Sequence, residues 1–179
     1  MVAVMQSKAA PTRAEFHAAI ARRSGHWYGA CLRITRDEDM AADAVQDALL
    51  SAWNKRHQFD GGSQLETWIH RIAVNAALQL LRKHRPERSQ PLDIELVDES
   101  PAPPEIHSDA ELGSQLSHSL RQLTDIERMC FVLKHLEQWR IREIADELGA
   151  NENNVKQALF RGLRKLRKSM ADLRSQHDE

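Results

Sequence analysis

The most constraining feature of this chain is a proline-rich, acidic stretch near its middle. Residues 84–118 contain five of the six prolines and carry eight acidic against two basic residues. Proline interrupts helices because it lacks an N–H donor, and like charges keep a chain extended. We therefore predict a flexible acidic linker over residues 86–111, between a first domain over residues 13–85 and a second domain over residues 112–175.

Both domains are predicted to be small and helical, so the expected fold class is all-α. The chain has only seven glycines and few β-branched runs. In the first domain we expect helices from Arg13 to Ile34, with a candidate break at Gly25, from Asp39 to Arg56, and over residues 65–85. The positions expected to face inward are Ala42, Val45, Leu49 and Trp53 on the second helix, and Trp68, Ile69, Ile72, Ala73, Ala76, Leu80 and Leu81 on the third.

The second domain ends in a pattern typical of a helix-turn-helix. Ile141, Ile144 and Leu148 form one apolar helical face. Gly149 follows, where glycine readily adopts the left-handed conformation that ends a helix, and Asn151 can cap the next one. The apolar stripe expected on this last helix consists of Val155, Leu159, Leu163, Leu166 and Met170.

The outer face of the last helix carries amide and basic side chains. Amides and guanidinium groups can form paired hydrogen bonds with base edges, whereas lysines mainly neutralise phosphate. A basic helix can also be no more than a solvated surface, but the short helix and glycine turn before it favour a recognition helix in the major groove. The outer residues are Asn153, Asn154, Lys156, Gln157, Phe160, Arg161, Arg164, Lys165, Arg167 and Lys168.

Motifs and composition argue against other classes of protein. None of the nine histidines is paired with a carboxylate or cysteine at metal-ligand spacing, so we expect no catalytic site, metal or cofactor. Cys31 and Cys130 lie in apolar helical patterns and are expected to be buried, reduced thiols. No segment reaches the roughly 18 apolar residues of a membrane span, and no signal peptide is evident, which favours a cytoplasmic protein without membrane insertion.

Three blocks of the chain resemble the extracytoplasmic-function (ECF, group 4) sigma factors of bacterial RNA polymerase. Residues 42–53 resemble region 2.2 of that family, residues 59–85 resemble regions 2.3 and 2.4, and residues 123–167 resemble region 4. The resemblance extends from about Phe16 to Leu173, and the order and spacing of the blocks make it specific. It implies a protein that binds core RNA polymerase and directs promoter recognition and opening.

The resemblance also implies three contact surfaces. Region 2.2 of the family docks on the clamp helices of the largest polymerase subunit, regions 2.3 and 2.4 hold the −10 element as it melts, and region 4 reads the −35 element as duplex. The matching residues are Asp43, Gln46, Asp47, Leu50 and Trp53 for polymerase; Phe59, Gly61, Gly62, Ser63, Trp68, Asn75, Gln79 and Arg82 for the −10 element; and Asn153, Asn154, Lys156, Gln157, Phe160, Arg161 and Lys165 for the −35 element. Trp53 can equally be a core residue, because it also belongs to the inward stripe.

Some positions depart from the family pattern. Ala158 and Leu163 stand where many members carry arginine, which predicts altered and weaker −35 contacts, and Arg140 replaces a common capping serine or threonine. Thr124 and Glu127 are predicted to form a capping box for the helix before it. The resemblance further implies an anti-sigma factor as a regulatory partner. The alternative reading is a helix-turn-helix regulator that acts without polymerase, although it leaves the first domain without a role.

Overall fold

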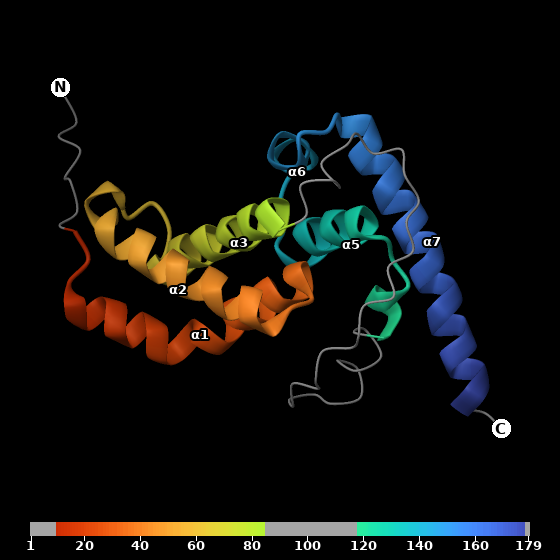
Figure 1. Ribbon diagram of the computed structural model, residues 1–179, viewed down its shortest axis with the longest axis horizontal. Coiled ribbons are helices and arrows are strands. Elements are labelled where there is room, and N and C mark those ends of the chain that lie inside the picture. Colours follow the sequence, from red (N-terminus) through yellow and green to blue (C-terminus); the bar gives the residue numbers. More distant parts are fainter. Residues whose placement is uncertain (1–9, 85–117, 178–179) are drawn as a thin grey trace. The chain divides into compact units, whose positions relative to one another are not determined.

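A computed structural model describes residues 10–84 and 118–177 of the chain, with side chains up to Ser169. The chain divides after residue 89 into two compact units, and the described residues of both are helical (Figure 1). The predicted all-α class with two helical domains is thus confirmed. The acidic linker predicted for residues 86–111 lies outside the described residues.

The first unit is built from helices that begin and end at clear local signals. The elements are α1 (Arg13–Thr35), α2 (Glu38–Asn54), the short 3-10 helix η1 (Arg56–Gln58) and α3 (Leu65–His84). A capping box between Thr12 and Glu15 starts α1, and Arg36 ends it with a φ of 56°. The helix continues through Gly25, so the candidate break at that residue is not formed.

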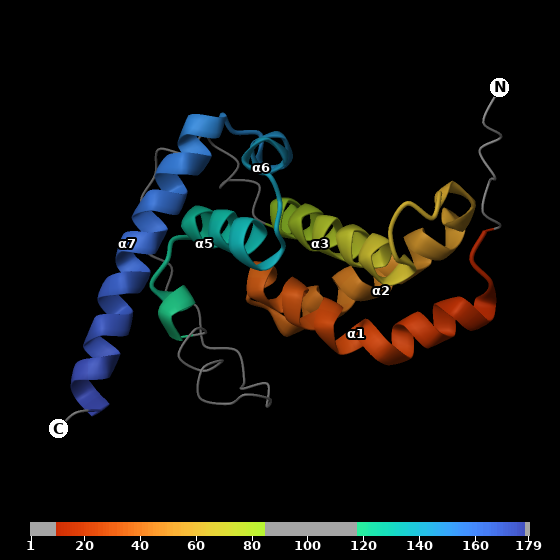
Figure 2. The same cartoon turned by 180° about the vertical axis from the view of Figure 1, so that it is seen from behind.

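A row of alanines on α2 forms one side of the first core. α1, α2 and α3 each pack against the other two (Figures 1 and 2). Because alanine carries only a methyl group, the neighbouring helices can approach this face of α2 closely. The predicted stripe on α2 is therefore wrong in register: Ala42 is exposed, and Val45, Leu49 and Trp53 are half-buried beside the alanines. The buried row consists of Ala41, Ala44, Ala48 and Ala52.

Larger side chains from α1 and α3 fill the rest of this core. Trp27 of α1 is fully buried, and the thiol of Cys31 donates to the backbone carbonyl of Ala73 over 3.5 Å. Neither Cys31 nor Cys130 forms a disulfide, and both are buried, as predicted. The prediction for α3 is confirmed at Ile69, Ala73 and Leu81, whereas Trp68, Ile72, Ala76 and Leu80 are only half-buried, and the buried set also includes Val74, Ala77 and Leu78.

The described part of the second unit contains the predicted helix-turn-helix. Its elements are α5 (Asp125–Phe131), the π-helix η3 (Val132–Leu136), α6 (Ile141–Leu148) and α7 (Glu152–His177). Both α5 and α6 pack against α7. Gly149 ends α6 with a φ of 62°, and the side chain of Asn151 accepts a hydrogen bond of 2.8 Å from the backbone N–H of Asn154. The predicted turn chemistry is confirmed at both residues.

The apolar face of α7 agrees with the predicted stripe over most of the helix. Val155, Leu159 and Leu166 are buried as predicted, and Leu163 is half-buried. The side chain of Met170 lies outside the described residues. Ala158 is also fully buried, which places it on the packing side of α7.

Candidate nucleic-acid interface

One face of α2 stays uncovered when the first unit folds. Asp43, Gln46, Asp47 and Leu50 recur at helical spacing and are all exposed. Leu50 is 58% exposed, which is unusual for a large apolar side chain on a helix with a well-packed opposite face. The structure therefore brings together four of the five residues that the resemblance assigned to polymerase binding.

The fifth residue of that set, Trp53, has a packing role. Its ring meets the ring of Phe16 edge-on, with the ring centroids 5.1 Å apart, which joins the end of α2 to the start of α1. The guanidinium of Arg56 lies 4.3 Å from the centroid of the same ring. Trp53 is half-buried, so part of its side chain packs in the core and part remains exposed.

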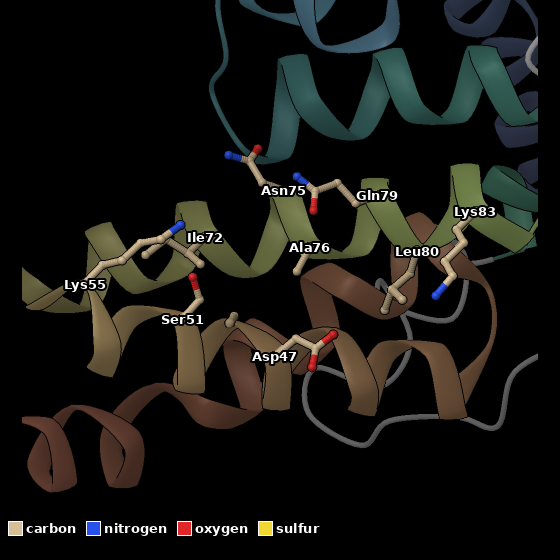
Figure 3. A pocket seen from close by; sticks show the side chains of 10 residues that line it. Asp47, Ser51, Lys55, Ile72, Asn75, Ala76, Gln79, Leu80 and Lys83 are labelled. Atoms are coloured by element: carbon tan, nitrogen blue, oxygen red, sulfur yellow. The ribbon is translucent and has the colours of Figure 1, made fainter.

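A groove of about 370 Å³ runs between α2 and α3 (Figure 3). Its apolar lining comes from Ala48, Ile72, Ala76 and Leu80. Its polar lining combines residues from two predicted sets, because Asp47 belongs to the polymerase set, and Asn75 and Gln79 belong to the −10 set. Lys55 and Lys83, which neither set includes, supply positive charge, and Ser51 adds a hydroxyl. The groove thus joins the two candidate surfaces of the first unit.

The loop between η1 and α3 is held in shape by local contacts. Gly61 has a φ of 74°, a conformation that favours glycine, and the Asp60 carboxylate accepts a hydrogen bond of 2.8 Å from the backbone N–H of Gly62. Gly62 and Ser63 are exposed. At the end of the loop, a hydrogen bond from Arg22 of α1 lowers the pKa of the Glu66 carboxyl.

The two aromatic residues beside this loop contact each other. The rings of Phe59 and Trp68 are 5.4 Å apart between centroids and tilted by 51°. Phe59 is only 7% exposed, so its ring is packed in the unit and does not form an open stacking platform. Trp68 keeps part of its surface exposed, and on α3 the side chains of Gln79 and Arg82 are exposed as well.

The exposed face of α7 contains most of the residues predicted to read duplex DNA. Asn153, Lys156, Gln157 and Phe160 are exposed, and Phe160 reaches 68%. Lys156 lies 3.8 Å from Glu152, one turn earlier on the same helix. Asn154 is half-buried, and its backbone N–H donates to the side chain of Asn151. An amide, a cation and an apolar ring thus project together from this face.

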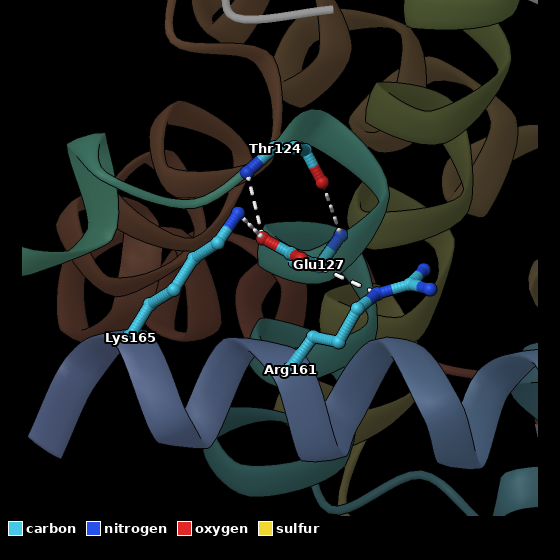
Figure 4. Close-up of polar contacts among 4 residues, drawn as sticks. All are labelled: Thr124, Glu127, Arg161 and Lys165. Atoms are coloured by element: carbon cyan, nitrogen blue, oxygen red, sulfur yellow. Dashed lines mark hydrogen bonds and ion pairs between the residues drawn. The ribbon is translucent and has the colours of Figure 1, made fainter. Parts of the chain in front are cut away.

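Two other predicted DNA-binding cations form ion pairs inside the second unit. Lys165 Nζ lies 2.9 Å from Oε2 of Glu127, and Arg161 Nε lies 3.5 Å from Oε1 of the same carboxylate (Figure 4). Glu127 belongs to α5 and is only 2% exposed. The sequence marked Glu127 solely as the capping partner of Thr124, since its other partners lie 34 and 38 positions further along the chain.

The described residues belong to two helical units, each with exposed candidate contact residues, and comparison with known proteins agrees with that division. Residues 20–87 match the family Sigma-70 region 2, and residues 114–166 match Sigma-70, region 4. The ECF RNA polymerase sigma factor SigW of Bacillus subtilis (strain 168) is 26% identical over 156 residues, which cover 82% of this chain and 83% of SigW. The chain is an ECF sigma factor of the sigma-70 family.

Two solved structures share the fold of this sigma factor. The first is the sigma factor RpoE in complex with the anti-sigma factor NepR from Bartonella quintana, with a TM-score of 0.57 and 22% identity over 88% of this chain and 97% of that one. The second is CnrH in complex with the cytosolic domain of CnrY, with a TM-score of 0.52 and 21% identity over 90% of both chains. Sigma factors direct RNA polymerase to promoters and are not enzymes, and the function of this chain follows from its family.

The two departures from the family pattern on α7 are not exposed side chains. Ala158, expected to mark a lost DNA contact, is fully buried and lies on the packing side of α7. Leu163 is half-buried.

A metal site and a membrane span are two features that the sequence does not predict. Within the described ranges 10–84 and 118–177, no group of three or more histidine, cysteine or acidic side chains could hold a metal ion. No helix in that described portion is long and apolar enough to cross a membrane.

Proposed function

We propose that the sigma factor docks on the clamp helices of the largest polymerase subunit through the exposed face of α2. The residues that carry this contact are Asp43, Gln46, Asp47 and Leu50, with the exposed part of Trp53 at the edge. Support comes from Leu50, a large apolar side chain that is 58% exposed on the folded unit. The acidic neighbours suit a partner surface that carries basic groups.

The −10 element is held by the groove between α2 and α3 and by the loop before α3. Asn75 and Gln79 line the groove and offer amide groups for the edges of unpaired bases. Trp68 and Arg82 recur with them at helical spacing on α3, and Gly61, Gly62 and Ser63 belong to the loop before it. Melting costs on the order of 1.4 kcal/mol per base-pair step, and stacking of an extruded base on an aromatic ring can offset about 1–3 kcal/mol. Phe59 contributes indirectly, because its ring supports Trp68 from within the unit.

The −35 element is read as duplex by α7 in the major groove. Asn153, Asn154, Gln157 and Phe160 face base edges, and Lys156, Arg161 and Lys165 contact phosphates or bases. The observation that carries the proposal is the joint exposure of an amide, a cation and an aromatic ring on α7. An exposed aromatic ring is suited to contact the methyl group of thymine.

The two DNA-binding surfaces act together only when polymerase joins them. Each domain has a small net charge, since residues 1–83 carry +3 and residues 119–179 carry +2. Weak electrostatic attraction keeps the isolated chain from binding promoters tightly. Docking on polymerase then raises the effective concentration of each surface at its promoter element, through the linker predicted for residues 86–111.

A pair of reciprocal substitutions tests the assignment of the two faces. Leu50→Asp, on α2, is expected to weaken binding to core polymerase by about tenfold or more, because it puts a charge into an apolar contact. Phe160→Asp, on α7, makes the same chemical change at a residue that is also exposed, so it serves as the matched control and leaves core binding unchanged. Fluorescence anisotropy of the labelled full chain with core polymerase measures both.

For DNA binding, the same two variants should show the opposite pattern to that for core binding. Phe160→Asp is expected to abolish binding of the holoenzyme to duplex upstream of the start site, while Leu50→Asp leaves the contact of the free chain with duplex DNA intact. Equal core affinity for wild type and Leu50→Asp contradicts the docking face. If the wild-type chain binds core polymerase but supports no promoter-specific transcription, the promoter-reading role is contradicted.

We also propose an anti-sigma factor as the regulatory partner. RpoE is bound to the anti-sigma factor NepR in a solved structure, and CnrH is bound to the cytosolic domain of CnrY. The test is to purify the tagged chain from cells and identify the proteins that co-purify with it. A co-purifying protein that suppresses transcription directed by the chain in a purified system supports this partner. Full promoter-specific activity of the chain as isolated from cells, with no such protein attached, contradicts it.

A further inference from the structure

Glu127 is a buried carboxylate in a small helical unit, where charged side chains are rarely buried unless they are paired. It lies near the start of α5, is 2% exposed, and faces the side of α7 that carries Arg161 and Lys165 (Figure 4). Burial of a charged carboxylate is costly unless it is paired and hydrogen-bonded. The contacts of Glu127 meet that requirement on both oxygens.

Each oxygen of the Glu127 carboxylate has a defined partner. Oε2 accepts a hydrogen bond of 3.0 Å from the backbone N–H of Thr124 and one of 2.9 Å from Lys165 Nζ, and Oε1 lies 3.5 Å from Arg161 Nε. The Thr124 contact completes a capping box and fixes the side chain at the helix start. The carboxylate is therefore a rigid acceptor for the two cations.

The packing of α7 against α5 explains how both cations reach one carboxylate. Arg161 and Lys165 are separated by one helical turn and share a face, with Gly162 between them. A Cβ at Gly162 would lie 3.6 Å from Cβ of Glu127 and 3.7 Å from its backbone oxygen. These are ordinary van der Waals distances, so this turn of α7 lies directly on the start of α5.

Lys156, on the same helix, is held in a different way. Its Nζ lies 3.8 Å from Oε2 of Glu152, and both side chains are more than half exposed. Such exposed pairs contribute little and are readily exchanged for phosphate. Arg161 and Lys165 instead have side chains 43% and 36% exposed beside a carboxylate that is 3% exposed, so only part of each cation faces solvent.

We infer that Glu127 is a positioning residue of the duplex-DNA surface, which orients Arg161 and Lys165 and neutralises part of their charge. The inference rests on the proposed role of α7 in reading duplex DNA. A cation held by a buried carboxylate keeps one geometry and loses less entropy when it meets DNA, which favours a matching sequence. Partial neutralisation reduces its attraction for any phosphate, which lowers binding to unrelated sequences.

The substitution Glu127→Gln tests this role in the full chain. Glutamine can still accept the hydrogen bond from Thr124 N–H, but it carries no negative charge to neutralise the two cations. Binding to a short duplex of randomised sequence should tighten, and the slope of log K against log salt should steepen by about one to two units, at roughly 0.9 for each phosphate neutralised. The preference for a duplex enriched from a randomised pool by the wild-type chain should fall at least severalfold.

Glu152→Gln is the matched control, because it removes the same charge from an exposed pair on α7 itself. It should change the salt slope and the sequence preference much less than Glu127→Gln does. Equal effects of the two variants overturn the inference, since net charge alone then accounts for both. An unchanged slope and preference in Glu127→Gln overturn it as well.

A second variant covers the case in which Glu127→Gln does not fold. Glu127→Met has a similar length and places an apolar group in the buried site, and Arg161 and Lys165 can then turn toward solvent. The same change in slope and preference is expected. If the Phe160→Asp variant of the otherwise wild-type chain still binds duplex DNA, the proposed role of α7 is wrong. If Phe160→Asp abolishes this binding but the Glu127 variants behave like Glu152→Gln, only the inference about Glu127 is wrong.

Discussion

At the scale of single residues, Gln138 shows where this chain departs from local preference. It joins η3 to α6 with a φ of 59°, a conformation in which a Cβ is disfavoured. Its side chain donates a hydrogen bond of 2.8 Å to the backbone oxygen of His135, which offsets part of the strain. At the other end of α6, a similar φ of 62° is adopted by a glycine, Gly149, which has no Cβ.

We expect Gln138→Gly to be at least as stable as the wild type and more stable than Gln138→Ala. Alanine keeps the backbone strain and loses the hydrogen bond, whereas glycine removes about 1 kcal/mol of that strain. Urea unfolding of the three proteins, followed by circular dichroism, measures the difference. Since glycine is normally about 1 kcal/mol worse than alanine within a helix, alanine as the better residue here would contradict the left-handed geometry.

The residue scale also shows what sequence could predict. Gly149 and Asn151 were identified as helix punctuation because each acts through its own backbone or through a neighbour three positions away. Glu127 was identified only as a capping residue, because its pairing with Arg161 and Lys165 depends on how α5 meets α7. Side-chain chemistry predicts local contacts and leaves distant ones undetermined.

At the scale of elements, α2 shows how a correct helix can be assigned the wrong face. Both Ala42–Val45–Leu49–Trp53 and Ala41–Ala44–Ala48–Ala52 have helical spacing. The larger residues of the first set favour burial on hydrophobicity alone. Close helix packing selects the second set, and this choice depends on the approach of α1 and α3, which the sequence pattern does not contain.

A paired substitution separates the two registers of α2. Ala44→Leu inserts a large side chain where the structure has no room, so we expect a loss of about 1–3 kcal/mol in the free energy of unfolding. Ala42→Leu, on the exposed side, should change it by less than about 0.5 kcal/mol. Tryptophan fluorescence during urea unfolding reports on the first unit, since three of the four tryptophans lie there. The reverse order of effects would contradict the register.

The groove between α2 and α3 carries a prediction about promoter opening. Asn75→Ala removes an amide from the groove lining, and we expect opening to slow by about tenfold, equivalent to a base contact of 1–3 kcal/mol, with polymerase affinity unchanged. Permanganate reactivity of melted thymines in the holoenzyme complex measures opening. Gln122→Ala removes an exposed amide from the other unit as a control; normal melting by Asn75→Ala would remove Asn75 from the site.

At the scale of the whole molecule, the organisation of the chain was largely predictable. Helical periodicity and the proline-rich acidic stretch were sufficient to separate two helical domains, because those signals are encoded in long segments. The exposure of the α2 and α7 faces also agrees with expectation at Leu50 and Phe160. The packed ring of Phe59 and the buried side chain of Ala158 were not predictable, since both depend on tertiary packing.

The chain as a whole acts as a promoter-specificity subunit of RNA polymerase. The most direct measurement is a pull-down of core polymerase by the tagged full chain in the absence of DNA, followed by run-off transcription on genomic fragments. We predict stable core binding and discrete new start sites that require the chain. Binding to DNA without any association with core polymerase would contradict the account and indicate an operator-binding regulator.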